Sequence, residues 1–274
     1  MKLVMTLLVR DEEDILQSNI EFHLAKGVDF IIATDNLSVD STADILKEYE
    51  NKGVLRYIHE YADNYNQRQW VTRMAKMASV KYGADWVINN DADEFWWPLE
   101  GSLKDTFSNI SGDRNIVIAN RSNFVAIEDF GSPFYDYMIY KQKRSLNSLG
   151  QSLPPKVAHR ACADIRVFQG NHGVDGLGPQ NSISDIIEIF HFPGRSRKQL
   201  LNKIIKGGAG YERNENLDEE VGLTWRVLYK EFIENGNLDR YFKSQFYSKD
   251  RIEKEIESGK LLVDERLKKF FNGL

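Results

Sequence analysis

The chain is expected to adopt an α/β fold with a mostly parallel sheet flanked by helices, because three features of its sequence agree. Runs of consecutive apolar residues, typical of strands covered on both faces, recur through the N-terminal part. Segments with apolar residues every three or four positions lie between these runs. Polar residues gather where three of the runs end. Ligands of such sheets bind beyond the carboxyl ends of the strands, so this edge is the expected site.

The alternating elements follow from the pattern in chain order. We expect strands at four apolar runs, Leu3–Val9, Phe30–Ala33, Val54–Ile58 and Asp85–Ile88. We expect helices between these strands, at residues 12–26, Ser41–Tyr49 and Asn66–Tyr82. Leu16, Ile20 and Leu24 recur at helical spacing and give the first helix an apolar face. Asp40 or Ser41 suits the N-cap of the second helix.

The regular alternation ends near residue 115. Short strand-like pieces at residues 116–119, 165–168 and 186–190 lie between loops rich in Gly, Pro, Asn and Ser, which predicts a small antiparallel extension of the sheet. Helical patterns follow at residues 196–207, 219–235 and 249–272. We therefore predict a main domain over residues 1–195 and a helical C-terminal appendage over residues 196–274 that packs on it.

The composition excludes several classes of protein. The 36 basic and 41 acidic residues give a net charge of −5, unlike nucleic-acid-binding proteins that rely on a basic excess. Cys162 is the single cysteine, so no internal disulfide can form and a reducing compartment is expected. The run Leu3–Val9 is shorter than the about 20 residues of a membrane-spanning helix, and no signal-peptide cleavage site follows it. We therefore predict a cytoplasmic protein that does not bind nucleic acid.

Asp91 and Asp93 carry the sharpest chemical signal, since this D-x-D sequence follows the fourth expected strand. One carboxylate can hold a divalent cation while the other meets a hydroxyl group of a ligand or a water molecule. Hard oxygen ligands suit Mg²⁺ or Mn²⁺, which usually also bind substrate phosphate oxygens. The alternative is a solvated acidic turn. The buried strand before the motif and the aromatic residues 95–97 after it, which could stack on a sugar or acceptor, favour a functional site.

Asp35 and His191 each follow an expected strand and have two interpretations. The Asp35 carboxylate suits a hydrogen bond from the N3–H group of uracil or thymine, whereas the alternative is a simple loop with Asx turns and a helix cap. His191 precedes a basic segment that includes Lys203. An imidazole metal ligand beside basic residues would suit a cation–diphosphate pair. An ordinary loop histidine and a solvated basic face are the alternatives.

Three further residues are candidates for chemistry. His172 and Asp175 lie in a glycine-rich loop, and either could act as a general base. A surface loop with ordinary polar residues is the alternative. Arg73, on the long third helix, could reach a phosphate or orient a carboxylate, or be an exposed helical arginine.

The order and spacing of these motifs resemble one group of enzymes. The sequence reads V-R-D-E from Val9, D-N-L-S-V-D from Asp35 and D-A-D-E-F from Asp91. These segments resemble the family-2-type glycosyltransferases of the GT-A fold, in the branch that reads R-N-E, D-N-x-S-x-D and D-x-D-E-F. His191-Phe192 and the lysines up to Gly207 resemble a later segment of that branch. The resemblance covers roughly residues 3 to 210.

The resemblance implies a GT-A-like fold and roles for particular residues. Leu8, Val9, Arg10 and Asp35 would cradle the base and ribose, while Asp91, Asp93 and His191 would bind ribose and a Mn²⁺ or Mg²⁺ ion. The complete set predicted to bind the nucleotide is Leu8, Val9, Arg10, Glu12, Asp35, Arg73, Asp91 and Lys203. Asp11 stands where the branch usually has Asn. The Glu-Asp pair that carries the base in many inverting members is not evident, so Asp175 and His172 are the candidates for that role.

The predicted function is a metal-dependent glycosyltransferase. It would move a sugar from a nucleotide diphosphate donor, UDP-linked, to a hydroxyl of a saccharide or another acceptor, in a single inverting displacement. A nucleotidyltransferase with a similar core, which would release pyrophosphate, is one alternative. A non-catalytic module that binds a nucleotide or sugar is the other.

The C-terminal residues Lys268 to Phe271 would suit a weak peripheral contact with the inner face of a membrane, since they combine two lysines with two aromatic rings. The acidic residues between Glu253 and Glu265 instead favour ordinary packing.

Overall fold

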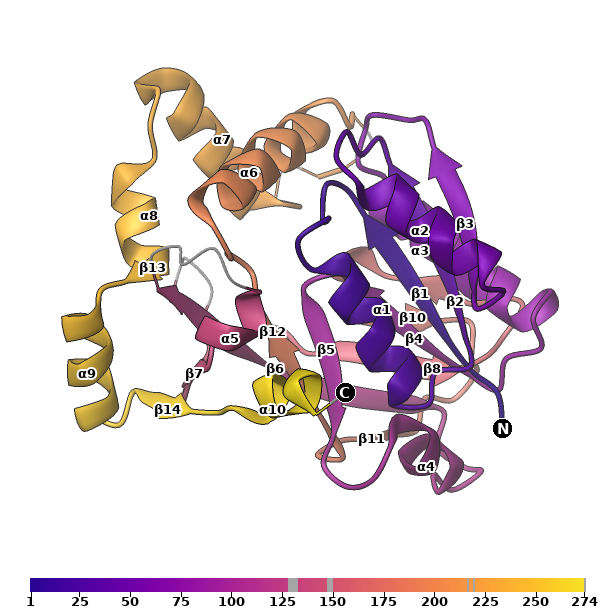
Figure 1. Cartoon of the computed structure of the whole chain (residues 1–274). Helices are drawn as coiled ribbons and strands as arrows, with labels where there is room; N and C mark the ends of the chain where they lie inside the picture. Colours follow the sequence, from indigo (N-terminus) through magenta and orange to yellow (C-terminus); the bar gives the residue numbers. More distant parts are fainter. Residues whose placement is uncertain (128–132, 147–149, 216, 219, 274) are drawn as a thin grey trace. The chain divides into compact units, whose positions relative to one another are not determined.

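A computed structural model describes residues 1–127, 133–146, 150–215, 217–218 and 220–273 of the chain (Figure 1). The chain forms two compact units. The first contains Met1–Ala62, Asn66–Arg121 and Pro154–Phe190, and the second contains Asp63–Tyr65, Ser122–Leu153 and His191–Leu274. The second unit thus takes in segments that precede residue 195 as well as the C-terminal part. A functional division at residue 195 stays a prediction.

The first unit is built on four parallel strands in the order β4-β1-β2-β3. Their bounds are β1 Leu3–Val9, β2 Phe30–Asn36, β3 Leu55–Glu60 and β4 Trp86–Asp91. Two antiparallel strands extend this sheet beside β4, first β8 (Lys156–Arg160) and then the N-terminal part of β6 (Ile116–Ile127). The predicted α/β class and mostly parallel sheet are confirmed.

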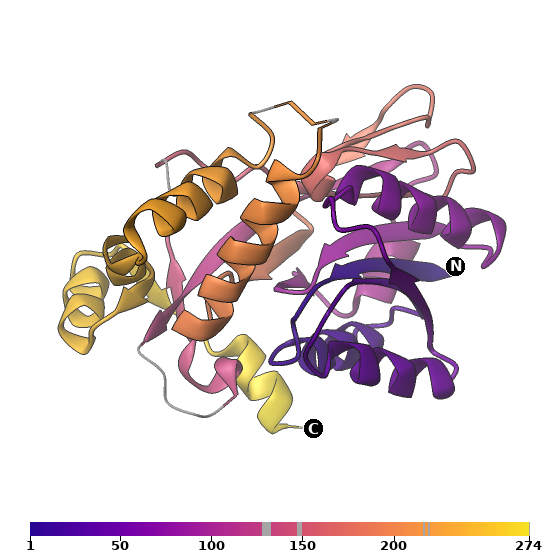
Figure 2. The same ribbon diagram turned by 90° about the horizontal axis from the view of Figure 1, so that it is seen from above.

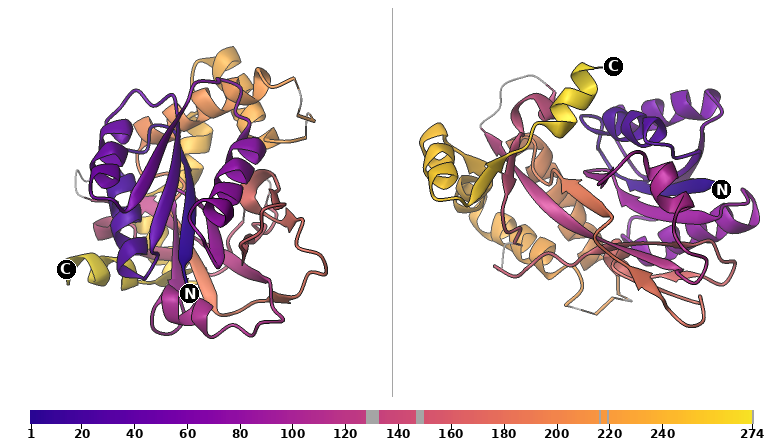
Figure 3. Two further views of the ribbon diagram at one scale, coloured as in Figure 1. Left: turned by 90° about the vertical axis from the view of Figure 1, so that its right-hand side faces the viewer. Right: turned by 90° about the horizontal axis from the view of Figure 1, so that it is seen from below.

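Helices cover both faces of the parallel strands. The two helices α1 (Leu16–Ala25) and α2 (Thr42–Asn51) lie on one face, and α3 (Gln67–Val80) lies on the other (Figures 2 and 3). All three were predicted to within a few residues. The Asp40 carboxylate accepts a hydrogen bond from the backbone N–H of Thr42 at 3.0 Å, so this side chain supports the start of α2.

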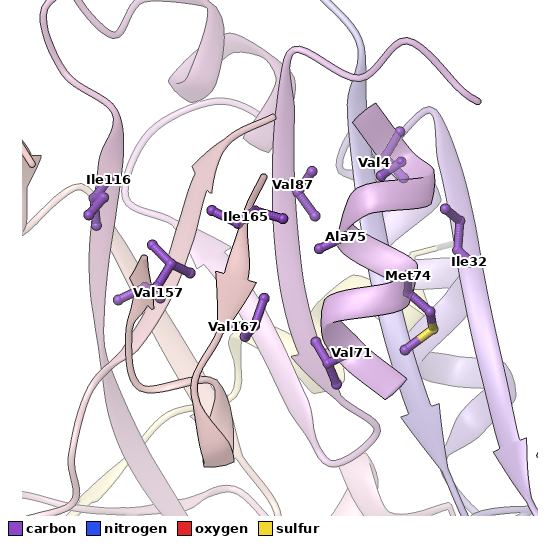
Figure 4. Packing of buried hydrophobic residues seen from close by; sticks show 12 residues of the cluster. Val4, Ile32, Val71, Met74, Ala75, Val87, Ile116, Val157, Ile165 and Val167 are labelled. Carbon is purple, nitrogen blue, oxygen red and sulfur yellow. The ribbon is translucent and has the colours of Figure 1, made fainter. Parts of the chain in front are cut away.

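The core under α3 joins the two halves of the sheet. Val71, Met74 and Ala75 of α3 point toward the strands, where they pack with buried valine and isoleucine side chains (Figure 4). These partners are Val4, Ile32, Val87, Ile116, Val157, Ile165 and Val167. β-Branched residues fill the sheet side of this core, as is usual for strands buried on both faces.

The aromatic residues after the D-x-D motif form a buried strand, β5 (Glu94–Pro98), which pairs with β12 (Ile187–His191). Phe95 and Trp96 are fully buried, and Trp97 stacks on Phe190 with 5.2 Å between ring centroids. Stacking of residues 95–97 on a sugar or acceptor is therefore wrong for Phe95 and Trp96, because these rings fill the core.

Short elements complete the first unit. They are α4 Leu103–Ser108, β9 Arg166–Val167, the 3₁₀ turn η1 Gln169–Asn171, β10 Val174–Asp175 and β11 Ser182–Ile183. β9 and β10 form an antiparallel hairpin, and β11 pairs in parallel with β6. The predicted antiparallel extension is thus present. Strand β9 lies within the expected piece 165–168, whereas β8 and β10 lie outside the pieces expected from the sequence.

The second unit is mainly helical. Its elements are α5 Phe134–Tyr137, β7 Tyr140–Gln142, α6 Arg197–Glu212, α7 Leu223–Asn235, α8 Asp239–Gln245, β13 Phe246–Tyr247, α9 Lys249–Glu257, β14 Leu261–Val263 and α10 Arg266–Asn272. Helices α6 and α7 lie side by side (Figure 2). The helix predicted at 219–235 starts at residue 219, which lies outside the described residues.

One long C-terminal helix over 249–272 is wrong. The helix ends at Glu257, and Gly259 then takes a left-handed φ of 69°, which glycine adopts at no steric cost. The following strand β14 pairs antiparallel with β7. Phe271 in α10 stacks on Tyr135 with 4.5 Å between centroids, so this ring packs within the unit. Across the described residues, no helix has the length and apolar character needed to cross a membrane.

Candidate active site

The carboxyl ends of three parallel strands bring four of the predicted nucleotide-binding residues together. Leu8 of β1 lies opposite Thr34 in β2 and opposite Asp91 in β4. Val9 lies opposite Asp35. The register therefore places Leu8, Val9, Asp35 and Asp91 along one edge of the sheet, which is where α/β proteins bind ligands.

Asp35 is fully buried at this edge. Its Oδ1 accepts a hydrogen bond from the backbone N–H of Ser38 at 3.1 Å, and its Oδ2 accepts one from the Tyr57 hydroxyl at 3.3 Å. Burial and the nearby Asp35 charge raise the pKa of Tyr57 to about 12, which keeps this hydroxyl protonated as a donor. The loop-stabilising role considered for Asp35 is present, and it holds the carboxylate at the sheet edge.

The loops after β1 and β2 are joined through Asp11. Its backbone N–H donates to Ser38 Oγ at 2.9 Å, and its Oδ1 accepts from the backbone N–H of Val39 at 2.8 Å. The φ of Asp11 is 52°, in the left-handed region that aspartate and asparagine tolerate better than most residues. Aspartate can therefore serve at this position in place of asparagine.

Arg10 and Glu12 are fixed to the same pair of loops. Arg10 Nη1 donates to Asn36 Oδ1 at 3.4 Å. The backbone N–H of Glu12 donates to Thr42 Oγ1 at 2.9 Å, and Glu12 is 7% exposed. Both residues predicted after β1 thus lie on a loop held by β2 and the start of α2.

Asp91 is held by three side chains from distant parts of the first unit. Its Oδ2 forms an ion pair with the Lys156 ammonium of β8. Its Oδ1 accepts hydrogen bonds from Asn171 Nδ2 at 3.1 Å and from Gln67 Nε2 at 3.5 Å. Lys156 is 1% exposed, so this pair is shielded from solvent on the lysine side. These three side chains therefore fix the position of the carboxylate.

Glu94 completes a buried charge cluster. Its Oε1 lies 3.3 Å from Lys156 Nζ and 3.3 Å from Arg121 Nη1. Its Oε2 is buried and has no hydrogen-bond partner among the described residues. Burial raises the pKa of Glu94 to about 7, opposed by the Lys156 charge and reinforced by Asp91. We refer to Asp91, Asp93, Glu94, Arg121 and Lys156 as the charge cluster.

Asn19 of α1 supports the turn between β4 and β5. Its Nδ2 donates to the backbone oxygens of Ala92 at 2.9 Å and Glu94 at 2.8 Å. Its Oδ1 accepts from Asn90 Nδ2 at 3.1 Å. These bonds fix the backbone on both sides of Asp93, so the position of that carboxylate depends on a fully buried amide.

His172 and Asp175 differ sharply in environment. The Asp175 side chain is 49% exposed and pairs with Arg166, which by hydrogen bond and charge holds the pKa of Asp175 below its ordinary value. His172 is half-buried, and its Nδ1 donates to the Pro155 carbonyl at 2.8 Å. Burial, with a smaller contribution from the Lys156 charge, lowers the pKa of His172 to about 4. The imidazole is therefore neutral near pH 7.

The tautomer of His172 leaves Nε2 with a lone pair. A carbonyl can only accept, so Nδ1 carries the proton and Nε2 does not. Nε2 faces Gly170, where a β-carbon would come within 2.5 Å of it. Nε2 has no hydrogen-bond partner among the described residues. An unprotonated nitrogen of His172 thus lies one residue from Asn171, which binds Asp91.

Comparison with known proteins decides the class of this site. The sequence model of glycosyltransferase family 92 matches residues 5–161, which is more than half of the chain. The chain belongs to glycosyltransferase family 92. The prediction of a glycosyltransferase of the GT-A type is thereby confirmed, and the protein is an enzyme of sugar transfer. The short motifs resemble family-2-type enzymes, whereas the family model that matches residues 5–161 is that of family 92.

Solved structures similar to this family 92 chain include proteins from two bacteria. S. aureus TarS 1-349 in complex with UDP-GlcNAc is 14% identical, with 86% of this chain and 75% of TarS covered and a TM-score of 0.49. Glucosyl-3-phosphoglycerate synthase from Mycobacterium tuberculosis, in complex with Mn²⁺, UDP-glucose and phosphoglyceric acid, is 17% identical, with 44% of each chain covered and a TM-score of 0.33. A search of curated proteins gives no match.

Three further residues of this family 92 chain were predicted for the site, namely Arg73, His191 and Lys203. Arg73 Nη2 pairs with Glu60 Oε2 at 2.9 Å, on the edge strand β3. His191 and Lys203 belong to the second unit. The side-chain oxygen Oδ1 of Asn123 accepts a hydrogen bond from His191 Nδ1 at 2.7 Å, so Nδ1 carries a proton. The roles of these three residues stay predictions.

The donor set of the family 92 site fits a hard divalent cation. No group of three or more His, Cys, Asp or Glu side chains within the described ranges is arranged to hold a metal alone. Mg²⁺ usually binds one or two carboxylates together with substrate phosphates. Asp91 already binds Lys156, Asn171 and Gln67. Asp91, Asp93 and His191 stay the predicted metal ligands, and Asp91 also stays a predicted ribose contact.

Several residues of the site were missed from the sequence. These are Gln67, Arg121, Lys156 and Asn171 around Asp91 and Glu94, and Asn19 under the turn. Asn19 has a detectable signal, because it falls on the same apolar face of α1 as Leu16 and Ile20. A polar residue on a buried helix face usually has a specific hydrogen-bonding role.

Proposed function

We propose that this chain transfers a sugar from a UDP-sugar to a hydroxyl of a saccharide or another acceptor, with Mn²⁺ or Mg²⁺ and with inversion at the anomeric carbon. The observation that carries the proposal is the register that puts Asp35 and Asp91 at one sheet edge in a family 92 chain, with Asp93 directly beyond. This edge then offers a hydrogen-bond acceptor for the base, a second one for a ribose hydroxyl, and a hard oxygen ligand for the metal ion.

Each part of the donor has a proposed partner. Uracil carries an N3–H donor that the buried Asp35 carboxylate can accept, beside Leu8 and Val9. Asp91 would accept a ribose hydroxyl. Asp93, with His191 on the family resemblance, would hold the metal ion. When bound, this ion would offset the negative charge that develops on the departing diphosphate.

The proposed base is His172. In the reaction the acceptor oxygen forms a bond to the anomeric carbon while the bond from that carbon to the β-phosphate oxygen breaks, and its electron pair leaves with UDP. The acceptor proton passes to Nε2 of His172, and the Nδ1 bond to Pro155 holds the ring as its charge develops. Asp175 is less suited, because its carboxylate is exposed and paired with Arg166.

We expect His172→Ala to reduce kcat about 10²–10⁴-fold with donor affinity unchanged, because only proton transfer is removed. Asp175→Asn should reduce kcat by less than about tenfold.

In the wild type the base is neutral above its pKa of about 4, so the rate should stay level between about pH 5.5 and about pH 7.5 and fall as the pH drops toward 4. A fall in rate centred near pH 6.5, or a larger loss of kcat in Asp175→Asn than in His172→Ala, would show that His172 is not the base.

Donor binding tests the proposed nucleotide directly. We expect UDP at about 100 times its Kd, with Mn²⁺, to raise the melting temperature by about 5 °C, because binding to the folded state alone contributes about 2.7 kcal/mol. EDTA should remove most of the shift, and CDP should give a smaller one because cytosine has no N3–H group. The measurement is thermal melting with UDP, GDP, CDP and TDP, each with Mn²⁺ and with EDTA. A lack of any shift would contradict the proposal.

The products separate the alternatives. Release of UDP from a UDP-sugar supports sugar transfer, whereas release of pyrophosphate from UTP would indicate a nucleotidyltransferase. Binding of UDP-sugar without turnover, in the presence of acceptors, would indicate a non-catalytic module.

A further inference from the structure

A cavity of about 390 Å³ lies in the first unit, on the α3 side of the sheet. Its floor is apolar and consists of Ile116 and Ile118 of β6 and Val157 of β8. These side chains point to the same face because Ile118 pairs with Val157 across the antiparallel strands. The volume is within the range of about 300–1,000 Å³ that small-molecule sites occupy.

One wall of the cavity is an exposed aromatic ring. Phe168 is 43% exposed although it lies between the buried Val167 and η1. Its backbone N–H donates to the Gly173 carbonyl at 2.9 Å, which closes the loop and fixes where the ring leaves the chain. An aromatic face beside branched apolar side chains provides a surface for the C–H groups of a ring-shaped ligand.

The rim of the cavity is polar. His172, Asp175, Gln180 and Ser182 line it, and Gln180 Nε2 is fixed by a hydrogen bond to the Val174 carbonyl at 2.8 Å. The rim therefore carries hydroxyl, amide, carboxylate and imidazole groups around an apolar floor. A sugar ring has the matching division, with C–H groups on its faces and hydroxyls at its edge.

The cavity adjoins the donor side of the site. His172 lines the cavity, and the preceding residue, Asn171, donates to Asp91 at 3.1 Å. A ligand in the cavity that contacts His172 would therefore lie one residue along the chain from the side chain that binds Asp91, the carboxylate proposed for the donor ribose.

We propose that this cavity is the acceptor subsite and binds a pyranose ring, with one face of the ring on Phe168 and a hydroxyl directed to Nε2 of His172. The proposal rests on the function proposed above and names its acceptor class as a saccharide. The limited volume indicates that one sugar unit occupies the cavity and that the rest of a longer acceptor would extend beyond it.

The experiment measures sugar contact without requiring turnover. Saturation-transfer NMR is recorded on the full chain with UDP and Mn²⁺, using the methyl glycosides of glucose, galactose, mannose, N-acetylglucosamine and xylose as probes. We expect C–H protons of at least one glycoside to receive saturation. Phe168→Ala should weaken that affinity about five- to tenfold, and Phe168→Trp should retain it because the ring face remains.

Leu99→Ala is the matched control, since Leu99 is an apolar side chain of the same unit, 55% exposed and outside the cavity. It should leave the glycoside signals unchanged. UDP-induced melting shifts of all variants show whether they fold and bind donor. A signal absent for every glycoside, or equal in Phe168→Ala and the wild type, overturns the acceptor subsite. If the Phe168-dependent signal persists while UDP-sugar is not turned over, the cavity binds sugar and the proposed function is wrong.

Discussion

Replacing Asp93 by alanine is expected to reduce sugar transfer at least about 10³-fold, because the carboxylate proposed to hold the metal ion is removed. The effect should fall on kcat, and Mn²⁺ should no longer stimulate the residual activity. The fold should survive, since the turn around Asp93 is fixed by the hydrogen bonds of Asn19 to Ala92 and Glu94. The measurement is UDP release from a UDP-sugar over a titration of Mn²⁺.

The matched control is Asp44→Ala on α2, where the carboxylate is 82% exposed and pairs with a neighbouring lysine across one helical turn. This variant should transfer sugar at the wild-type rate. Retained, Mn²⁺-stimulated transfer in Asp93→Ala would refute the metal-ligand assignment. Equal losses of sugar transfer in both variants would indicate a general effect of removing one negative charge.

Replacing Lys156 by methionine is expected to lower the free energy of unfolding by about 3–5 kcal/mol, because a buried charge cluster loses one of its cations. Lys156 is 1% exposed and contacts both Asp91 and Glu94, and Glu94 is fully buried. Without the ammonium, the remaining carboxylates repel one another in a poorly solvated place. Urea unfolding followed by circular dichroism measures the change.

Two further variants give this prediction its controls. Glu94→Gln combined with Lys156→Met removes one of the uncompensated carboxylates, and it should restore about half of the lost stability or more. Lys104→Met breaks an ion pair with Asp29 whose side chains are about one-third exposed, and it should cost no more than about 1 kcal/mol. Equal destabilisation in Lys104→Met and Lys156→Met would contradict the role of burial.

The parallel half of the fold could be predicted because its information is local. The run Leu3–Val9 and the stripe Leu16, Ile20 and Leu24 show their periods within one element, and the alternation of strands and helices then predicts a parallel sheet. Once the strands are parallel, their ends must share an edge. The convergence of Val9, Asp35 and Asp91 follows from the pattern and requires no knowledge of side-chain contacts.

The partners of Asp91 could not be predicted because they depend on distant pairing. Lys156 is 65 residues away along the chain and reaches Asp91 only through the antiparallel pairing of β4 with β8. The β8 segment is short and carries Lys156 and His159 among its apolar residues, so neither alternation nor a continuous apolar run marks it as a strand. The 3₁₀ turn that brings Asn171 to Asp91 likewise has no periodic signal.

The helix predicted over 249–272 failed for a different reason, because two helices were predicted as one. Its apolar residues fit a helical period on both sides of Gly259, so periodicity alone joins two helices. The left-handed glycine, with the strand Leu261–Val263 after it, separates them. Local glycine geometry therefore outweighs the longer pattern at this point.

The amides under the D-x-D turn have an evolutionary consequence. The Trp96 indole N–H donates to Asn90 Oδ1 at 3.0 Å, and Asn90 Nδ2 donates to the side-chain oxygen of Asn19. The backbone carbonyl of Asn19 accepts from His23 Nδ1 at 2.7 Å, and His23 Nε2 accepts the Trp96 backbone N–H at 3.2 Å. The bonds close into a ring, so a change at any one position leaves a buried group of another without a partner. Positions 19, 23, 90 and 96 should thus tolerate substitution only in concert and diverge as a single inherited unit.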